Sequence, residues 1–317
     1  HFNLDFTYYN SHTSNQTFDP QISGGTGFSK IIIQSGNVRN QGIELALGYR
    51  NTWRDFTWDT NYTLSTNQNK IISLANNVIN YATGERFSID RLNMGGLGDA
   101  QFLLQEGGTL GDLYSRRDLR YDENNAIYID ENGNVATETI QDVNKYVKLG
   151  SVLPDVNMSW RNDFRWRNFN FGFMVSARLG GVVFSRTQSM LDYYGVSEVS
   201  AVARDAGGVT LNGGDVVDAY TWYSAIAGGN SIPQFYTYSA TNVRLQEASI
   251  GYTIPRKLLR NVCEITVSIV GRNLWMLYNK APFDPESIAT TGNYYQGIDY
   301  FMMPSLRNVG FNLRLKF

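Results

Sequence analysis

Apolar and polar side chains alternate one by one along separate stretches of the chain. The last stretch is GFNLRLKF at residues 310–317, where Asn312, Arg314 and Lys316 stand between apolar side chains. Alternation with a period of two is typical of a strand with one apolar and one polar face. The same pattern predicts eight strands: residues 2–9, 42–50, 56–66, 155–166, 169–181, 243–255, 263–275 and 310–317. Most are about nine to eleven residues long, the length that a tilted strand needs to cross a bilayer.

The connections between these strands alternate in length. Short turns follow the second, fourth and sixth strands, in the segments NTWRD, RWRN and RKLLRN. The other connections are long, covering roughly residues 10–40, 66–153, 180–240 and 275–302. Outer-membrane barrels have short periplasmic turns and longer extracellular loops in this alternation. The pattern predicts an all-β chain of about eight antiparallel strands in a transmembrane β-barrel, with its C-terminal end in the periplasm.

Composition supports strands over helices. The chain has 30 Gly, 20 Tyr, 17 Phe and 6 Trp, and aromatics make up 14% of it. Several aromatic residues lie near predicted strand ends, which indicates girdles at the membrane interfaces. The preference of aromatic residues for strands in general is the alternative explanation. These residues are Tyr8, Tyr9, Tyr49, Trp53, Trp58, Trp166 and Trp275.

Several classes of protein are disfavoured. The sequence contains no run of 18 apolar residues, so it predicts no transmembrane helix. This does not exclude a transmembrane β-barrel, in whose strands apolar residues alternate with polar ones. The net charge of −2 argues against nucleic-acid binding. One cysteine, Cys263, excludes an internal disulfide and a zinc site built on cysteines.

No catalytic constellation stands out, so we do not expect an enzyme. The two histidines, His1 and His12, offer little for Ser-His-Asp catalysis or a metal site. We expect the neighbouring carboxylates Asp122 with Glu123 and Asp284 with Glu286 to be solvated in loops. The segment YIDENGNVATE lacks the spaced carboxylates of a calcium loop, and its Asn-Gly pair predicts a hairpin turn. We expect neither a metal nor a cofactor.

Blocks of the sequence resemble SusC/RagA-type TonB-dependent transporters in order and spacing. They are GNVRNQGIELALGYR, LGSVLPDVNMSWRNDFRWRNFNFGFMVSARLGG, TNVRLQEASIGYTIPRKLL, VSIVGRNLWML, FDPES and GIDYFMMPSLRNVGFNLRLKF. The resemblance implies a 22-stranded barrel with an N-terminal plug, of which residues 1–317 would be the C-terminal third. The opening HFNLDFTYYN has no initiator Met or signal peptide and already shows a strand pattern. We therefore expect the plug and the N-terminal strands to lie outside this chain.

The resemblance also implies a function. It indicates import of oligosaccharides or peptides across the bacterial outer membrane, with a SusD-like surface lipoprotein as partner. Energy would come from the TonB complex, acting through the N-terminal region, and transporter–lipoprotein pairs would form a dimer. The alternatives are a passive porin-like barrel, a barrel enzyme, and a soluble β-sandwich that binds carbohydrate.

Candidate functional residues fall into three sets. Aromatic rings in the long connections can stack on sugars, or can instead pack the loops together; we expect substrate contacts from Tyr193, Tyr194, Trp222, Tyr223, Tyr236, Tyr294 and Tyr295. The polar strand face, expected to line the lumen, includes Asp5, Glu44, Asp59, Asn61, Arg161 and Arg178. The C-terminal segment resembles the signal that outer-membrane assembly machinery recognises, through lipid-facing Phe311, Leu313, Leu315 and Phe317.

Overall fold

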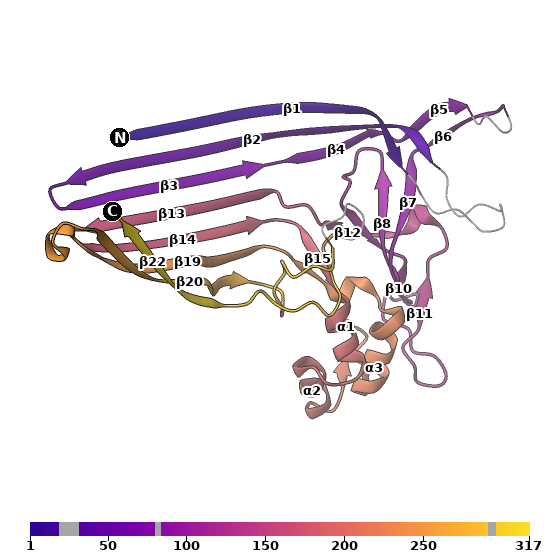
Figure 1. The fold of residues 1–317 in the computed structure, drawn as a ribbon. Coiled ribbons are helices and arrows are strands. Elements are labelled where there is room, and N and C mark those ends of the chain that lie inside the picture. Colours follow the sequence, from indigo (N-terminus) through magenta and orange to yellow (C-terminus); the bar gives the residue numbers. More distant parts are fainter. Residues whose placement is uncertain (19–31, 80–83, 291–295) are drawn as a thin grey trace.

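The computed structural model describes residues 1–18, 32–79, 84–290 and 296–317. It has a long antiparallel sheet, called the main sheet here, and a compact group of smaller elements at one end of that sheet (Figure 1). The main-sheet strands are β1 (Phe2–Phe18), β2 (Ile33–Trp53), β3 (Phe56–Thr66), β13 (Val156–Trp166), β14 (Phe169–Leu179), β19 (Asn242–Ile254), β20 (Glu264–Asn279) and β22 (Asn308–Lys316). Each pairs with the next in chain order, and β4 (Gln68–Ser73) adds to β2.

The predicted all-β fold with eight antiparallel strands is confirmed, and each predicted stretch lies on one of these strands. The boundaries differ at the start of the chain, where β1 has 17 residues and β2 has 21. Residues 10–18 of β1 are mostly polar on both faces, so the alternation stops there. The ladder of pairs to β2 nevertheless continues as far as Phe18.

The predicted alternation of short and long connections is also confirmed. Two hairpins turn through two residues each, Arg54–Asp55 and Arg167–Asn168. The third short turn joins β19 to β20 and contains the 3₁₀ helix η5 (Arg256–Leu259). All three turns lie at the end of the main sheet where both termini are found, opposite the compact group (Figure 1).

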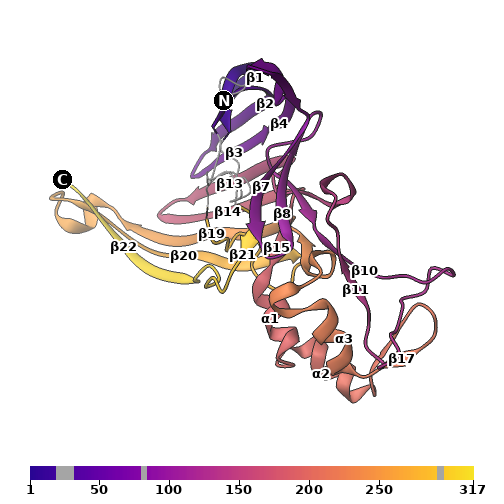
Figure 2. The same cartoon turned by 90° about the vertical axis from the view of Figure 1, so that its right-hand side faces the viewer.

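The register of the main sheet separates two faces. Apolar side chains of neighbouring strands stand in rows, such as Leu4, Leu47, Tyr62, Trp160 and Val175. Viewed along the strands, the sheet is bent into an arc (Figure 2). Because no layer formed by the described residues covers this apolar face, many of its side chains are exposed.

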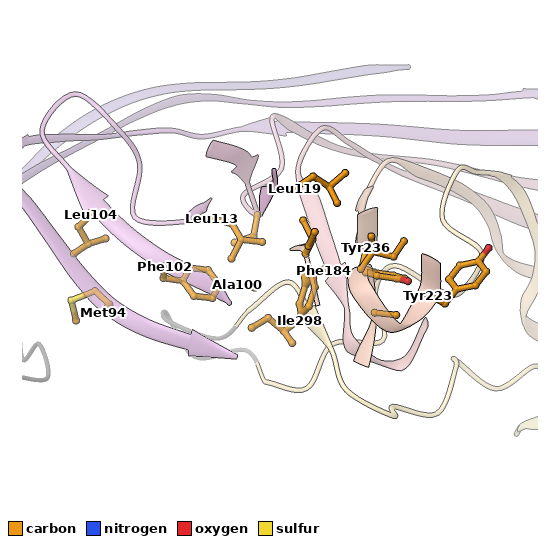
Figure 3. Close-up of a cluster of buried hydrophobic side chains, with 14 of the residues drawn as sticks. Met94, Ala100, Phe102, Leu104, Leu113, Leu119, Phe184, Tyr223, Tyr236 and Ile298 are labelled. Atoms are coloured by element: carbon orange, nitrogen blue, oxygen red, sulfur yellow. The ribbon is translucent and has the colours of Figure 1, made fainter. Parts of the chain in front are cut away.

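The long connections fold together into what we call the loop assembly, formed by the described parts of residues 74–155, 180–241 and 280–307. It contains β5 (Ala75–Ile79), β6 (Arg86–Ile89), β7 (Arg91–Leu97), β8 (Ala100–Gln105), β9 (Asp112–Ser115), β10 (Arg117–Leu119), β11 (Thr137–Thr139), η2 (Val143–Lys145), β12 (Val147–Ser151), β15 (Val182–Ser185), β16 (Val209–Thr210), β17 (Val216–Val217), η3 (Gly228–Asn230), η4 (Pro233–Tyr236), β18 (Thr237–Ser239) and β21 (Ile298–Asp299). The apolar core lies mainly here, with Phe102, Leu113, Phe184 and Ile298 almost fully buried (Figure 3).

The loop assembly also holds three helices that the sequence analysis did not predict. They are α1 (Arg186–Tyr193), α2 (Glu198–Asp205) and α3 (Ala219–Ile226), each eight residues long. Each begins after a capping side chain, Ser185, Ser197 or Asp218, that accepts a hydrogen bond from a backbone N–H of the first turn. Helices this short depend on tertiary packing, so periodicity alone gives a weak signal.

Three further observations concern helix length, the turn at Asn132 and metal-ligating side chains. No helix in the described ranges is long and apolar enough to span a membrane. The segment around Asn132 forms the predicted turn, in which Gly133 N and Asn134 N donate to the carbonyl and the carboxylate of Asp130. Within the part of the chain that the structure describes, no group of three or more His, Cys, Asp or Glu is placed to hold a metal ion.

Candidate functional site

The polar face of the main sheet carries an ordered set of charges. All six residues expected on this face share it, as the pairing of Asp59 with Asp163 and of Asn61 with Arg161 illustrates. The face is hollowed over β1, β2, β3 and β13, where about 430 Å³ of open space is lined by Asp5 and Glu44 among others. It therefore presents a polar, partly concave wall, while the apolar side chains lie on the other face.

Ion pairs form within and between the strands of this polar wall. Arg161 lies 2.7 Å from the Asp163 carboxylate and 3.7 Å from Glu247, and Arg272 lies 3.1 Å from Glu247. Both arginines are about half to two-thirds exposed, with side-chain values of 46% and 67%. Ion pairs with this degree of exposure contribute little to stability. Their charged groups can also contact a solute beside the polar wall, because they are exposed.

A second hollow lies at the outer end of the loop assembly, among the three helices. It encloses about 440 Å³ and is lined by residues of α1, α2 and α3 and the segments that flank them. Tyr194 and Tyr220 stand at its edge, 68% and 79% exposed, while Tyr223 is buried beneath. Burial, together with the nearby Asp192 carboxylate, raises the pKa of Tyr223, so this phenol remains a hydrogen-bond donor at neutral pH.

Polar groups complete this helix hollow. Asp192 is 5% exposed and accepts a hydrogen bond of 2.7 Å from Gln188. Arg204 donates to the Gly195 carbonyl at 2.8 Å, which holds its guanidinium at the edge. The hollow thus combines aromatic faces with a carboxylate and a guanidinium, a mixture suited to a ligand with both apolar and polar surfaces.

The predicted aromatic residues are divided between surface and core. Tyr193 and Tyr194 are exposed beside the helix hollow, and their rings meet edge to face with centroids 5.3 Å apart. Trp222, Tyr223 and Tyr236 belong to the buried core, with Tyr236 only 1% exposed (Figure 3). Trp222 and Tyr236 pack the loop assembly together, while Tyr223 belongs to the same core and also lines the helix hollow.

Two further candidates, Tyr294 and Tyr295, lie outside the described residues. The hollow also includes Tyr220, which was not among the predicted substrate contacts. It stands at the second position of α3, and only the fold of the helices brings it close to α1 and α2. A sequence signal that could have found it is the Asp218 cap, which places the start of that helix.

Arg244 forms a buried polar node, called the Arg244 node here, where β19 enters the loop assembly. Its guanidinium lies 2.9 Å from Asp284 and 3.2 Å from Glu286, and its own side chain is 5% exposed. Asn242 donates to Glu286 at 3.2 Å and accepts from Arg244 at 3.3 Å. These contacts attach the FDPES segment to the edge of the main sheet.

The expectation that both carboxylates of this segment are solvated is wrong for Asp284, because Arg244 and two backbone N–H groups surround it. Burial alone would raise the pKa of Asp284. Hydrogen bonds from Ser305, Glu286 and Arg244 outweigh burial and hold the pKa below the usual value of 3.8. The carboxylate is therefore charged at neutral pH and paired with Arg244.

The final strand β22 keeps the predicted alternation. Phe311, Leu313 and Leu315 pair with Ile269, Val267 and Ile265 of β20 and share the apolar face. Their exposed fractions are 83%, 64% and 50%, and Phe317 is 80% exposed. The strand itself ends at Lys316, one residue before the terminal aromatic.

Comparisons with known proteins support this description. No protein-family model matches the chain. The chain is 26% identical over 341 residues to "TonB-dependent receptor P3" of Formosa agariphila, an alignment that covers 99% of the chain and 32% of that receptor. It is 25% identical over 241 residues to "TonB-dependent receptor SusC" of Bacteroides thetaiotaomicron, covering 74% of the chain and 22% of that receptor. The chain thus spans about a third of the length of the first of these relatives.

A solved structure of the RagAB peptide transporter shares the fold. The TM-score is 0.68 at 15% identity, and the match covers 100% of this chain and 33% of the solved one. The RagAB peptide importer in its "closed-closed" state gives a TM-score of 0.67 at 14% identity. The chain is therefore SusC/RagA-like, related over nearly its whole length to TonB-dependent receptors.

Proposed function

We propose that this chain is the C-terminal part of the barrel wall of an outer-membrane transporter that TonB energises. The observation that carries the proposal is the main sheet, whose eight strands pair in unbroken chain order with one apolar and one polar face. An exposed apolar face over this many strands is stable when it contacts lipid. The names of the similar receptors and their greater length support the same proposal.

In this proposal each region of the chain has a distinct task. The apolar face contacts lipid, and the polar wall with Arg161, Glu247 and Arg272 lines the lumen through which substrate passes. The loop assembly lies on the extracellular side, since the short turns are at the opposite end. The parts that close the lumen and contact TonB belong to the remainder of the longer protein.

The proposed substrates are oligosaccharides or peptides, bound first at the loop assembly. The helix hollow supports this, because its exposed tyrosines can stack on a sugar ring or an aromatic side chain while Arg204 and Asp192 meet polar groups. A SusD-like surface lipoprotein would cover the loop assembly, and two transporter–lipoprotein pairs would form a dimer. The name RagAB peptide transporter of a structurally similar protein agrees with a peptide as one of the two substrate classes.

The C-terminal segment would act during assembly of the barrel. The side chains of Phe311, Leu313 and Leu315 stand exposed on one face of β22, ready for recognition by assembly machinery. Deletion of Phe317 should lower the amount of assembled protein more than uptake per assembled molecule. A normal amount in the outer membrane after the deletion would refute this role.

Uptake in cells tests the whole proposal. A strain that lacks the complete receptor gene should lose uptake of its oligosaccharide or peptide substrate, and the restored gene should recover it only while TonB is functional. Recovery without TonB would favour a passive porin-like barrel. A protein that stays in buffer without detergent would favour a soluble β-sandwich that binds carbohydrate, and turnover of the substrate would indicate an enzyme.

A further inference from the structure

The three short turns share an unusual residue. Arg54, Arg167 and Arg260 each adopt a left-handed backbone conformation, with φ of 55°, 52° and 53°. In the described residues, the other non-glycine positions with positive φ are five asparagines and Phe301. Asn, Asp and Gly ordinarily fill such positions, because the conformation costs other residues roughly 1 kcal/mol. Backbone preference therefore does not explain arginine at all three turns, which points to a role for the charged side chain.

Two of these turns repeat a four-residue motif. The sequence is WRDF at residues 53–56 and WRNF at residues 166–169. The turns lie side by side, since Arg167 N donates to the Asp55 carbonyl at 2.8 Å. The Arg167 guanidinium lies 3.3 Å from the Asp55 carboxylate and 5.7 Å from the centre of the Trp166 ring. The second motif thus holds an exposed cation beside an exposed indole, and in the first motif the exposed Arg54 directly follows the exposed Trp53.

The aromatic residues of these motifs continue into one row across the sheet. Successive register partners are Trp53, Phe56, Trp166, Phe169 and Tyr252. Trp53, Trp166 and Phe169 are 48%, 55% and 52% exposed. They are exposed even though Trp53 stacks on Phe56, Trp166 stacks on Phe169, and Phe169 meets Tyr252 edge to face. The row is the last layer of the apolar face before the turns, so it has apolar surface on one side and cations on the other.

The end of the sheet beyond this row is basic. Its exposed cations are Arg54, Arg167, Arg256, Lys257, Arg260 and Lys316, and the acidic side chains of its turns and strand ends are those of Asp55 and Glu264. The third turn adds apolar surface through Leu258 and Val262, 71% and 64% exposed. A ligand that complements this arrangement carries a negative charge joined to a long apolar part.

We propose that the turn arginines and the aromatic row form a binding site for an anionic phospholipid. The phosphate lies against Arg54 and Arg167, and an acyl chain lies along the Trp166 and Phe169 rings. The inference rests on the proposed placement of the main sheet in a membrane. Free phosphate would explain the cations but not the exposed row, and an acidic protein segment would leave that row exposed to water. Basic residues beside apolar membrane surface attract anionic headgroups by this mechanism.

The test measures lipid retained by the complete receptor, purified in detergent and incubated with equal amounts of phosphatidylglycerol and phosphatidylethanolamine. Native mass spectrometry then counts the bound lipids. The wild-type receptor should retain phosphatidylglycerol preferentially. The double variant Arg54→Asn/Arg167→Asn should lose that preference by roughly tenfold, and because Asn suits the left-handed conformation, its thermal stability should stay the same or rise.

A matched control removes two charges from the other face at the same end of the sheet. Arg50→Asn/Arg165→Asn should keep the lipid preference, since both side chains belong to the polar face, where Arg165 bonds Asn170. Three results would overturn the proposal: an unchanged preference in the turn variant, an equal loss in the control, or displacement of the lipid by millimolar inorganic phosphate. Retention of an acidic protein in place of lipid would overturn it as well.

The lipid-retention test can fail independently of the uptake test of the proposed transport function. Failure of transport would appear as absent uptake by the wild-type receptor, whatever lipid it retains. Failure of the lipid site would leave uptake intact and the lipid preference unchanged in the turn variant. The same variants examined in both assays therefore separate the two.

Discussion

The main sheet and the loop assembly use the same aromatic residue types in opposite ways. Phe171 and Trp166 of the main sheet are 47% and 55% exposed, whereas Phe184 and Tyr236 of the loop assembly are 0% and 1% exposed. The loop assembly buries its apolar side chains against one another, as a globular domain does. The main sheet leaves them on a face that no other part of the described chain covers, and in the proposed function this face contacts lipid.

The largest expected difference in stability is between a buried phenylalanine of the loop assembly and an exposed phenylalanine of the main sheet. Phe184→Ala should lower the free energy of unfolding of the loop assembly by about 3–5 kcal/mol, because it leaves a cavity in a packed core. Phe171→Ala should cost under about 1 kcal/mol, since about half of that side chain is already exposed in the folded state. Hydrogen exchange of the β15 and β14 amides in the complete receptor measures both. Equal costs would show that the two regions do not differ in packing.

The buried ion pairs of Arg244 should contribute more to stability than the exposed ion pairs of the polar wall. Arg244→Met should destabilise the loop assembly by roughly 3 kcal/mol, because it leaves the Asp284 carboxylate buried without its cation. Arg272→Met is the matched control, as it also removes an arginine that pairs with a glutamate, but that arginine is 67% exposed. Its cost should stay below about 1 kcal/mol. The measurement is the hydrogen-exchange rate of the amides around residue 284. Equal changes of this rate in both variants would contradict the account.

A smaller effect should appear on acidification. The pKa of Asp284 is lower in the folded chain than the ordinary value of 3.8, so its contribution to stability is fully present above that value. The contribution is lost as the pH falls through the folded pKa. Unfolding of the loop assembly, followed by denaturant titration at several pH values below 5, should show this loss. Asp284→Asn should show a flatter pH dependence, and an identical slope would exclude the Arg244 node as its source.

The smallest effects should be found at the helix hollow. Tyr194→Ala and Tyr220→Ala should each weaken substrate binding about fivefold, roughly the free energy of one lost aromatic contact, without a change in stability. Tyr121→Ala is the control, since that residue is 48% exposed and lies outside the hollow. Equilibrium binding of the substrate to the complete receptor measures the effect. Equal affinities for all three variants would show that the hollow does not contact substrate.

The sequence predicted the main sheet well because its two faces meet different surroundings along the whole length of each strand. The alternation of Leu313 with Asn312 and Arg314 is therefore a local signal that needs no knowledge of distant contacts. The two-residue turns are local as well, so the order of strands and connections followed directly. The outer part of β1 was missed where both of its faces are polar and only pairing with β2 defines the strand.

The loop assembly could not be predicted in the same way, because its structure depends on contacts between distant segments. Nothing near Tyr236 in the sequence distinguishes it from Tyr194, yet one is buried in the core and the other is exposed. Arg244 meets Asp284 across 40 positions of the chain, so neither carries a local sign of the node. The short helices had local signals in Ser185, Ser197 and Asp218, but their length hides the helical period.

The central claim is that the main sheet separates lipid from an aqueous lumen, and cysteine labelling across β3 tests it most directly. In a complete receptor carrying Cys263→Ser, the variants Thr63→Cys, Leu64→Cys and Ser65→Cys are labelled in intact outer membranes. Thr63 and Ser65 belong to the polar face and Leu64 to the apolar face. The account predicts that a hydrophilic maleimide labels positions 63 and 65, while position 64 reacts only with a lipid-soluble one. Equal labelling of all three by the hydrophilic reagent would contradict it.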